Sequence, residues 1–161
     1  MFKPLRNSGP SVRTGARTVF VKAKTAEGKA LLQSERMATL FIEVLRSYVP
    51  AGGFKVNEFV VMRNFVHLLI TVEGEMTTTT ALRSIRGRFA YRAKEQFGLR
   101  GWIWQKDFSE VRVNGRQNFL KYKSLIEEVP VKAGLARSAE EYPYCSLYLR
   151  RQKAAQAGSG S

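Results

Sequence analysis

The sequence predicts an α+β fold, a ferredoxin-like antiparallel sheet with helices packed on one face. Segments with strand and helix patterns follow one another as strand, helix, strand, strand, helix, strand, helix, which is the order of a ferredoxin-like sheet. The chain has 161 residues and 44% of them are hydrophobic, which is enough for one buried core. We therefore expect a domain over 18–150, preceded by a flexible basic arm over 1–17 and followed by a disordered, linker-like tail over 151–161.

The first half of the chain predicts three strands and one helix. Residues 18–24 alternate as a half-buried strand does. Ser34 stands where a helix N-cap is expected, and apolar residues then recur at helical spacing until a proline and two glycines end the pattern. The longest apolar, β-branched run is broken by an Arg-Asn pair. It predicts strands over 54–62 and 65–72, joined by a tight hairpin.

The second half predicts two long helices on either side of a further strand. Residues 81–97 have a helical pattern rich in Arg and Lys, preceded by four threonines and closed by a glycine. Segments 102–105 and 108–113 predict the last strand. A helix is expected over 116–128 and should end at Pro130, because proline disfavours helical backbone before it. A shorter turn and helix follow.

The charge balance indicates a polyanionic partner. There are 27 Lys and Arg residues against 13 Asp and Glu, a net charge of +14. Such a field favours nucleic acid and makes binding salt-dependent, with general solubility as the alternative interpretation. Two tryptophans, Trp102 and Trp104, either stack on bases or pack in the core. The cations expected to contact phosphate are Arg13, Arg17, Arg83, Arg86, Arg88, Arg92, Lys94 and Arg112.

Five segments, in order along the chain, resemble the HUH single-strand transposases, and most closely their REP-associated tyrosine transposase branch. Met62–Leu69 is similar to the histidine signature of that family, and the other four segments are 85–93, 103–108, 130–135 and 140–146. The resemblance covers nearly the whole chain. It implies the HUH transposase fold, a DNA partner that is single-stranded or folded into hairpins, and a homodimer.

The resemblance also implies a catalytic site, and this chain departs from it. The family holds a divalent metal with two histidines on one strand face, while a tyrosine on a helix attacks the phosphodiester. Here the histidine positions are Phe65 and His67, the nucleophile position is Leu125, and the third-ligand position is Val129. Phe65 and His67 share one face of their strand, and Leu125 and Val129 share one face of their helix. Because three of the four side chains offer no metal donor, we expect apolar volume to fill the former site.

We therefore predict a transposase-like protein that binds single-stranded or hairpin DNA, has lost strand cleavage and joining, and needs no cofactor. The alternative is an active tyrosine transposase or nickase with a rearranged site. It would use Tyr122 as nucleophile and hold Mg²⁺ or Mn²⁺ on His67 with Glu110, Glu127 or Glu128. A third hypothesis, a structural or protein-binding role, predicts no salt-sensitive binding to oligonucleotides.

The cellular location is expected to be the bacterial cytoplasm. The sequence has no apolar run of about 18 residues, so no membrane span is expected, and its start has no apolar signal-peptide core. Its one cysteine, Cys145, excludes an internal disulfide and fits a reducing compartment. Cys145 is interpreted as a small, semi-buried residue, because no histidine or acidic partner is evident for nucleophilic chemistry.

Overall fold

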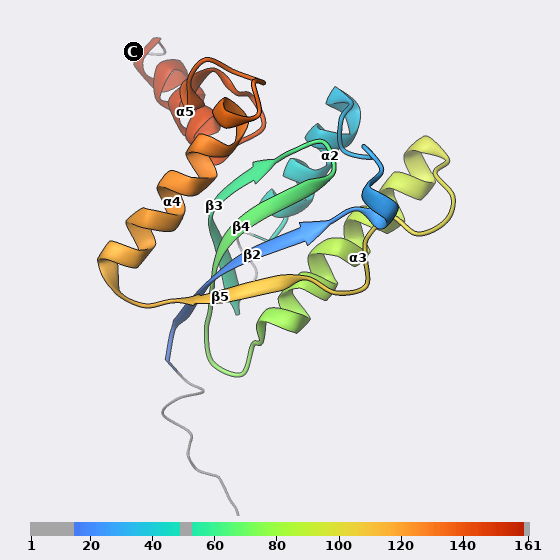
Figure 1. Ribbon diagram of the computed structural model, residues 1–161, viewed down its shortest axis with the longest axis horizontal. Coiled ribbons are helices and arrows are strands. Elements are labelled where there is room, and N and C mark those ends of the chain that lie inside the picture. Colours follow the sequence, from blue (N-terminus) through green and yellow to red (C-terminus); the bar gives the residue numbers. More distant parts are fainter. Residues whose placement is uncertain (1–14, 49–52, 160–161) are drawn as a thin grey trace, which may run out of the picture.

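The computed structural model describes residues 15–48 and 53–159. Its centre is a four-stranded sheet in the order β3-β4-β2-β5, with every neighbouring pair antiparallel (Figure 1). The strands are β2 (Arg17–Lys24), β3 (Phe54–Val61), β4 (Phe65–Val72) and β5 (Ser109–Val113). This order, with one helix after β2 and another after β4, confirms the predicted α+β class and its ferredoxin-like sheet.

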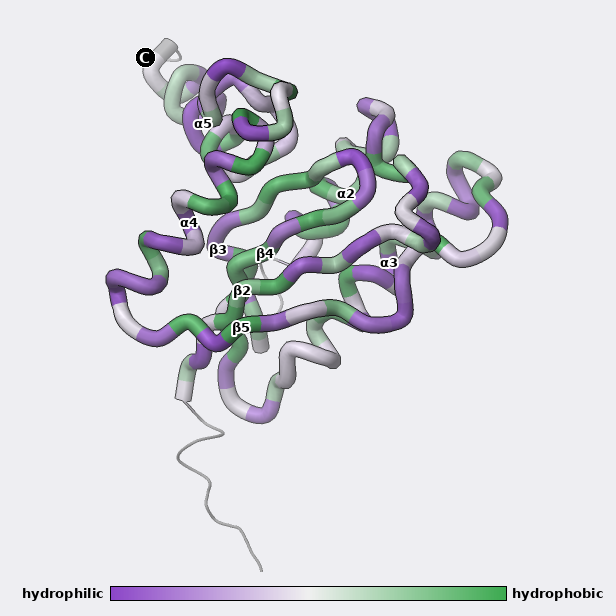
Figure 2. Tube along the Cα trace, viewed as in Figure 1, coloured by the Kyte–Doolittle hydropathy of each residue, from purple (hydrophilic) through white to green (hydrophobic). Residues whose placement is uncertain are grey.

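Helices cover both faces of the sheet, not one face as expected. The α-helices of the described chain are α2 (Glu35–Arg46), α3 (Thr78–Phe97), α4 (Gly115–Lys132) and α5 (Ser146–Ser159). α2 and α3 pack over one face around the larger core, which contains Phe41 and Leu68. α4 and the start of α5 pack over the other face around a second core, which contains Leu69 and Ile126. Since β4 is apolar on both sides, as its green colour in Figure 2 shows, both faces need a cover.

The two helices of the larger core begin at capped residues. Ser34 caps α2 as predicted. α3 begins at Thr78 and not at Ala81, because Thr77 Oγ1 accepts a hydrogen bond from the Thr80 N–H at 3.1 Å and so caps an earlier turn. The threonine run therefore forms the first turn of α3, and Thr78 is itself buried.

α4 continues through Pro130 to Lys132, although the sequence predicts an end at the proline. A proline lacks only the N–H that would bond to the carbonyl of Ile126, so a single hydrogen bond is lost so near the helix end. Beyond it, the Pro130 carbonyl accepts a hydrogen bond from the Leu135 N–H at 2.9 Å. Pro130 is also buried, and the packing of its ring favours the extra turn.

Two further segments differ from the sequence prediction. β5 contains only residues 109–113, and the segment around Trp104 contributes a single bridge to Thr25. α5 continues to Ser159, through residues expected to form a disordered tail, because the Ala, Gln and Lys residues of this segment favour helix. Within the described parts of the chain, no helix is both long enough and apolar enough to cross a membrane.

A buried polar group fixes α5 to β3. Glu58 is 6% exposed and lies next to a bulge in β3. Its carboxylate accepts two hydrogen bonds from Arg150, at 3.0 and 3.1 Å, and one from Ser146 Oγ at 2.8 Å. Ser146 Oγ in turn accepts a hydrogen bond from the Phe59 N–H at 3.0 Å. These donors satisfy a carboxylate that would otherwise be costly to bury, and they set the orientation of α5.

Candidate functional site

A row of aromatic rings lies on the α4-facing side of the sheet. Phe65 and His67, two residues apart on β4, share this side, and their ring centroids are 4.9 Å apart. Phe20, from β2, meets His67 edge to face with centroids 5.0 Å apart. Tyr122, from α4, stacks on Phe20 at 4.8 Å. The histidine of the expected metal site is therefore packed between two phenylalanine rings.

His67 is buried in its neutral form. The residue is 6% exposed, and its Nδ1 has no hydrogen-bond partner among the described residues. Burial, and to a smaller extent the charge of Lys22, lower the pKa of His67 from 6.5 to about 4. Lys22 pairs with His67 across the two strands, and its Nζ lies 4.4 Å from the centroid of the Phe65 ring. At neutral pH the site is an uncharged imidazole among apolar side chains.

α4 covers this side of the sheet with further apolar side chains. Ile126 is 1% exposed and belongs to the second core, and Val129 packs against that core. Leu125 is half-buried, but the second core does not include it. The structure thus brings Phe65 and Val129 into one cluster and leaves Leu125 on the flank of the helix, next to Ile126.

The residues at the four family positions do not fit a divalent metal. Such an ion needs several nitrogen or oxygen donors, mostly oxygen for Mg²⁺ and Mn²⁺. His67 is the single donor among these four positions. Across residues 15–48 and 53–159, no three His, Cys, Asp or Glu side chains lie close enough together to hold an ion.

Each carboxylate of the alternative site either lies on the other face of the sheet or is paired with a lysine. Glu110 pairs with Val21 across β5 and β2, and Val21 belongs to the larger core, so Glu110 lies on the opposite face of the sheet from His67. Glu127 and Glu128 each form an ion pair with a lysine one helical turn away. In the part of the chain that the structure describes, these three carboxylates do not gather around His67.

Three of the arginines expected to contact phosphate also make contacts that hold parts of the fold together. Arg17 donates to two carbonyls of the loop before α3, at 2.7 and 3.1 Å. Arg86 donates to two carbonyls of the loop before β5, at 2.9 and 3.4 Å. The pKa of Arg86 is lowered, because the effect of burial outweighs the opposing effect of Asp107. Arg92 forms an ion pair with Glu43 of α2 at 3.2 Å. Sequence alone does not reveal such contacts, because a backbone carbonyl can belong to any residue.

The other predicted cations that the structure describes lie on α3 or on the α3 side of the sheet. Arg83 and Lys94 are exposed on α3, and Arg88 lies over the ring of the tyrosine that follows α2. Arg112, on β5, pairs with Val19 of β2. Because Val19 belongs to the larger core, Arg112 lies on the α3 side of the sheet. Arg13 lies outside the described residues. The described members of the predicted set therefore lie on α3 or on the α3 side of the sheet, opposite the aromatic row.

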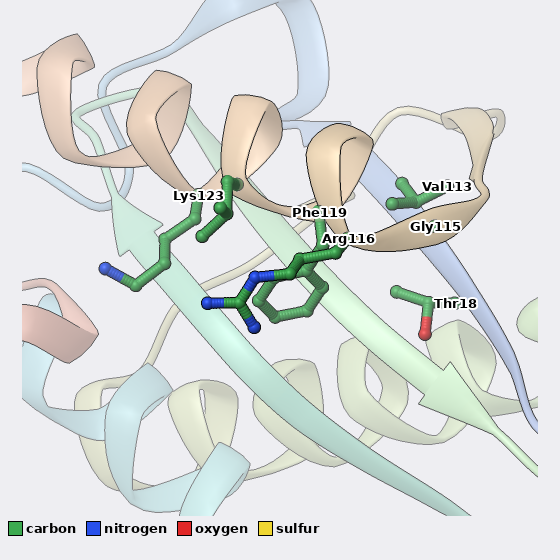
Figure 3. A pocket seen from close by; sticks show the side chains of 7 residues that line it. Thr18, Val113, Gly115, Arg116, Phe119 and Lys123 are labelled. Carbon is green, nitrogen blue, oxygen red and sulfur yellow. The ribbon is translucent and has the colours of Figure 1, made fainter.

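A pocket of about 470 Å³ lies where α4 begins beside β2 and β5, at residues that the sequence pattern does not single out (Figure 3). Its lining residues are Thr18, Val113, Gly115, Arg116, Phe119, Leu120 and Lys123. Figure 3 shows the Arg116 side chain extending across the ring of Phe119 and Lys123 extending from the same helix. The seven-residue spacing of the two cations, about two helical turns, is a sequence signal that could have placed them on one face of the helix. Two cations beside an aromatic ring suit a phosphate and a base.

The sequence matches the family model of IS200-like transposases over residues 19–128, which is more than half of the chain. The protein therefore belongs to the IS200-like transposase family, in agreement with the resemblance seen in its motifs. No curated protein matches the sequence significantly.

Two solved structures are similar in fold. One is a REP-associated tyrosine transposase bound to a REP hairpin, with 24% sequence identity, a TM-score of 0.65, and coverage of 82% of this chain and 77% of that chain. The other is a candidate transposase from Deinococcus radiodurans R1, with 16% identity, a TM-score of 0.55, and coverage of 75% of this chain and 95% of that chain. At these identities the similarity shows a common fold.

Proposed function

We propose that this protein is a member of the IS200-like transposase family that binds single-stranded or hairpin DNA and has lost strand cleavage and joining. The observation that carries the proposal is the packing at the metal-binding strand. Phe65 takes the place of a metal-binding histidine and packs on His67 with ring centroids 4.9 Å apart. The Nδ1 atom of His67 is buried without a hydrogen-bond partner in the described chain.

The chemistry of strand cleavage explains why this packing matters. A tyrosine transposase needs an attacking oxygen, and Leu125 has none at the nucleophile position. It also needs a cation to stabilise the charge that develops on the phosphate, and Phe65 and Val129 have no atom that could bind one. Phe65 and Val129 instead pack against the second core, where even partial burial of apolar surface stabilises the fold.

DNA binding is supported by charge and by a structural relative. The net charge of +14 favours a polyanion. The similar REP-associated transposase is bound to a REP hairpin. The pocket with Arg116 and Lys123 gives this chain one place where two cations and a ring lie together.

Two measurements on the same oligonucleotides test the proposal. A fluorescently labelled hairpin with single-stranded flanks is titrated with protein at several salt concentrations, and the same hairpin is incubated with Mg²⁺ or Mn²⁺ and resolved on a denaturing gel. We expect binding that weakens steeply with salt and no cleaved or protein-linked product. A product attached to a tyrosine would overturn the loss of cleavage, and Tyr122→Phe would then show whether Tyr122 is the nucleophile. Absence of salt-sensitive binding to single strands, hairpins and duplexes would overturn the DNA-binding proposal.

A further inference from the structure

The two tryptophans of the segment before β5 have opposite environments. Trp104 is 9% exposed and packs in the larger core, with its ring centroid 5.8 Å from that of Phe41 and 5.7 Å from that of Phe89. Trp102 is 87% exposed, although it is the largest apolar side chain type. The sequence leaves stacking and packing open for both residues, and the structure separates them.

Trp102 is exposed on a segment that is firmly held. The next residue, Ile103, is 3% exposed, and its carbonyl accepts a hydrogen bond from the Ala26 N–H at 2.8 Å. Further on, the Gln105 N–H donates to the Lys24 carbonyl at 2.9 Å, and Arg86 donates to the Gln105 carbonyl at 2.9 Å. The indole is therefore presented on a fixed backbone, which reduces the entropy lost when a ligand stacks on it.

Two cations and one acid, Asp107, lie within five residues of Trp102 along the chain. Arg100 and Lys106 are exposed on the same segment, and the exposed Lys24 is joined to it through the hydrogen bond to Gln105. The other large apolar side chains that are exposed in the described chain belong to helices α3 and α4, to β5 and to the loop after α4. None of them lies on the segment that carries Trp102, so in the described chain this segment presents a single exposed ring and not the group of apolar side chains typical of a protein-binding hot spot. Positive charge around one exposed ring is instead the pattern of a single-strand binding platform.

We propose that Trp102 stacks on an unpaired base of the bound nucleic acid, while Arg100 and Lys106 contact the adjoining phosphates. This inference rests on the proposed DNA binding, and it names the part of the ligand that this segment recognises. It predicts a preference for single-stranded or unpaired positions over a fully paired duplex, since only an unpaired base exposes its face to the indole.

Tryptophan fluorescence tests the contact directly. The chain has two tryptophans, so the buried Trp104 serves as an internal reference for Trp102. Titration of the wild-type protein with an oligothymidine should quench the exposed fluorophore, and Trp102→Phe should remove most of the quenching. Equal quenching in both proteins, or none in a wild-type protein that binds the strand, would overturn the proposal.

Affinity measurements separate this inference from the proposed function. Trp102→Ala should weaken binding of a hairpin with an unpaired flank by about 5- to 150-fold, the range for loss of one stacked base, without changing the salt dependence. Trp102→Phe should lose less of this affinity. Both variants should bind a blunt duplex as tightly as the wild-type protein does. Tyr91→Ala, at an aromatic residue that is 65% exposed on α3, is the matched control. Unchanged affinity in Trp102→Ala would overturn the stacking site alone, whereas a wild-type protein that binds no oligonucleotide would overturn the proposed function as well.

Discussion

The ring centroids of Phe65 and His67 lie 4.9 Å apart, and the ring centroid of Phe20 lies 5.0 Å from that of the same imidazole. Among the described residues, burial lowers the pKa of His67 most, the charge of Lys22 lowers it further, and no carboxylate acts in the opposite direction. The neutral ring thus packs against two phenylalanines of the second core. This relationship makes His67 a determinant of stability, with a direction that follows from its pKa.

Stability should decrease as the pH falls from about 6.5 to about 4. The pKa of His67 is about 4 in the folded protein and 6.5 as its ordinary value, so the unfolded chain takes up a proton first. The contribution of neutral His67 to the free energy of unfolding is fully present above pH 6.5, falls as the pH drops, and is lost below pH 4. The shift corresponds to roughly 3 kcal/mol in the free energy of unfolding. Urea unfolding at several pH values measures it.

A variant assigns this pH dependence to one residue. Because the sequence has one histidine, the imidazole proton resonances followed by NMR report His67 alone. His67→Leu should flatten the stability profile between pH 4 and 6.5, since it leaves no titrating ring there. A profile as steep in His67→Leu as in wild type would assign the effect to carboxylates. An NMR titration midpoint near 6.5 would contradict the burial of the ring.

Donors restored at the family positions should restore metal binding. Phe65→His would place two imidazoles on one face of β4, and Leu125→Tyr with Val129→Asn would add oxygen donors from α4. We expect isothermal titration calorimetry to detect Mn²⁺ binding in the triple variant. The control replaces the same three residues by alanine, which opens space without donors and should bind no Mn²⁺. No uptake by a folded triple variant would mean that α4 and β4 no longer have the geometry that a metal site needs.

Arg86 should matter for stability more than for DNA binding. Its guanidinium donates to two carbonyls of the loop before β5, so Arg86→Ala should lower the free energy of unfolding by about 1 kcal/mol. Arg83→Ala, an exposed position on the same helix, should change it by less than about 0.5 kcal/mol. Urea denaturation compares the two. If Arg86→Ala unfolds like wild type and loses DNA affinity instead, Arg86 contacts phosphate as the sequence predicts.

These residues show what sequence could and could not predict. The longest apolar, β-branched run placed β4 at 65–72, because the composition of a strand with two buried faces is a local property of the sequence. Sequence reasoning ended α4 at Pro130, but the helix continues to Lys132. The prediction failed because it could not foresee the burial of the proline ring, which depends on tertiary packing. The same reasoning grouped Arg86 with exposed cations, because its carbonyl partners lie on another segment. It could not choose between Trp102 and Trp104, since exposure depends on the path of a loop and not on its composition.

The pocket at the start of α4 should contribute more to DNA binding than the outer side of α3. Arg116 and Lys123 lie together beside Phe119, so Arg116→Ala with Lys123→Ala should weaken binding. It should also reduce the slope of log affinity against log salt by about 0.7–0.9 for each phosphate that the variant no longer neutralises. Arg83→Ala with Lys94→Ala removes the same charge from α3 and is the matched control. Fluorescence anisotropy at four salt concentrations measures both slopes, and a larger loss in the α3 variant would place the DNA on that helix.

Loss of Arg150 should destabilise the attachment of α5 because it leaves the buried carboxylate of Glu58 with Ser146 as its remaining side-chain donor. The Arg150 side chain is 48% exposed and that of Glu58 is 8% exposed, so we expect Arg150→Ala to cost about 2 kcal/mol, below the range for a fully buried pair. Glu58→Gln combined with Arg150→Ala should cost less than the sum of the single changes, because a neutral amide needs no cation.

The neighbouring residue provides the control for this pair. Arg151 is exposed on the same helix, and Arg151→Ala removes the same charge from α5. The free energy of unfolding of the Arg151→Ala variant should stay within about 0.5 kcal/mol of that of the wild-type protein. Urea unfolding of the four proteins in the Glu58–Arg150 cycle gives the coupling energy directly. A coupling energy near zero, or equal losses in Arg150→Ala and Arg151→Ala, would show that α5 is held by its apolar contacts with the second core and not by the carboxylate.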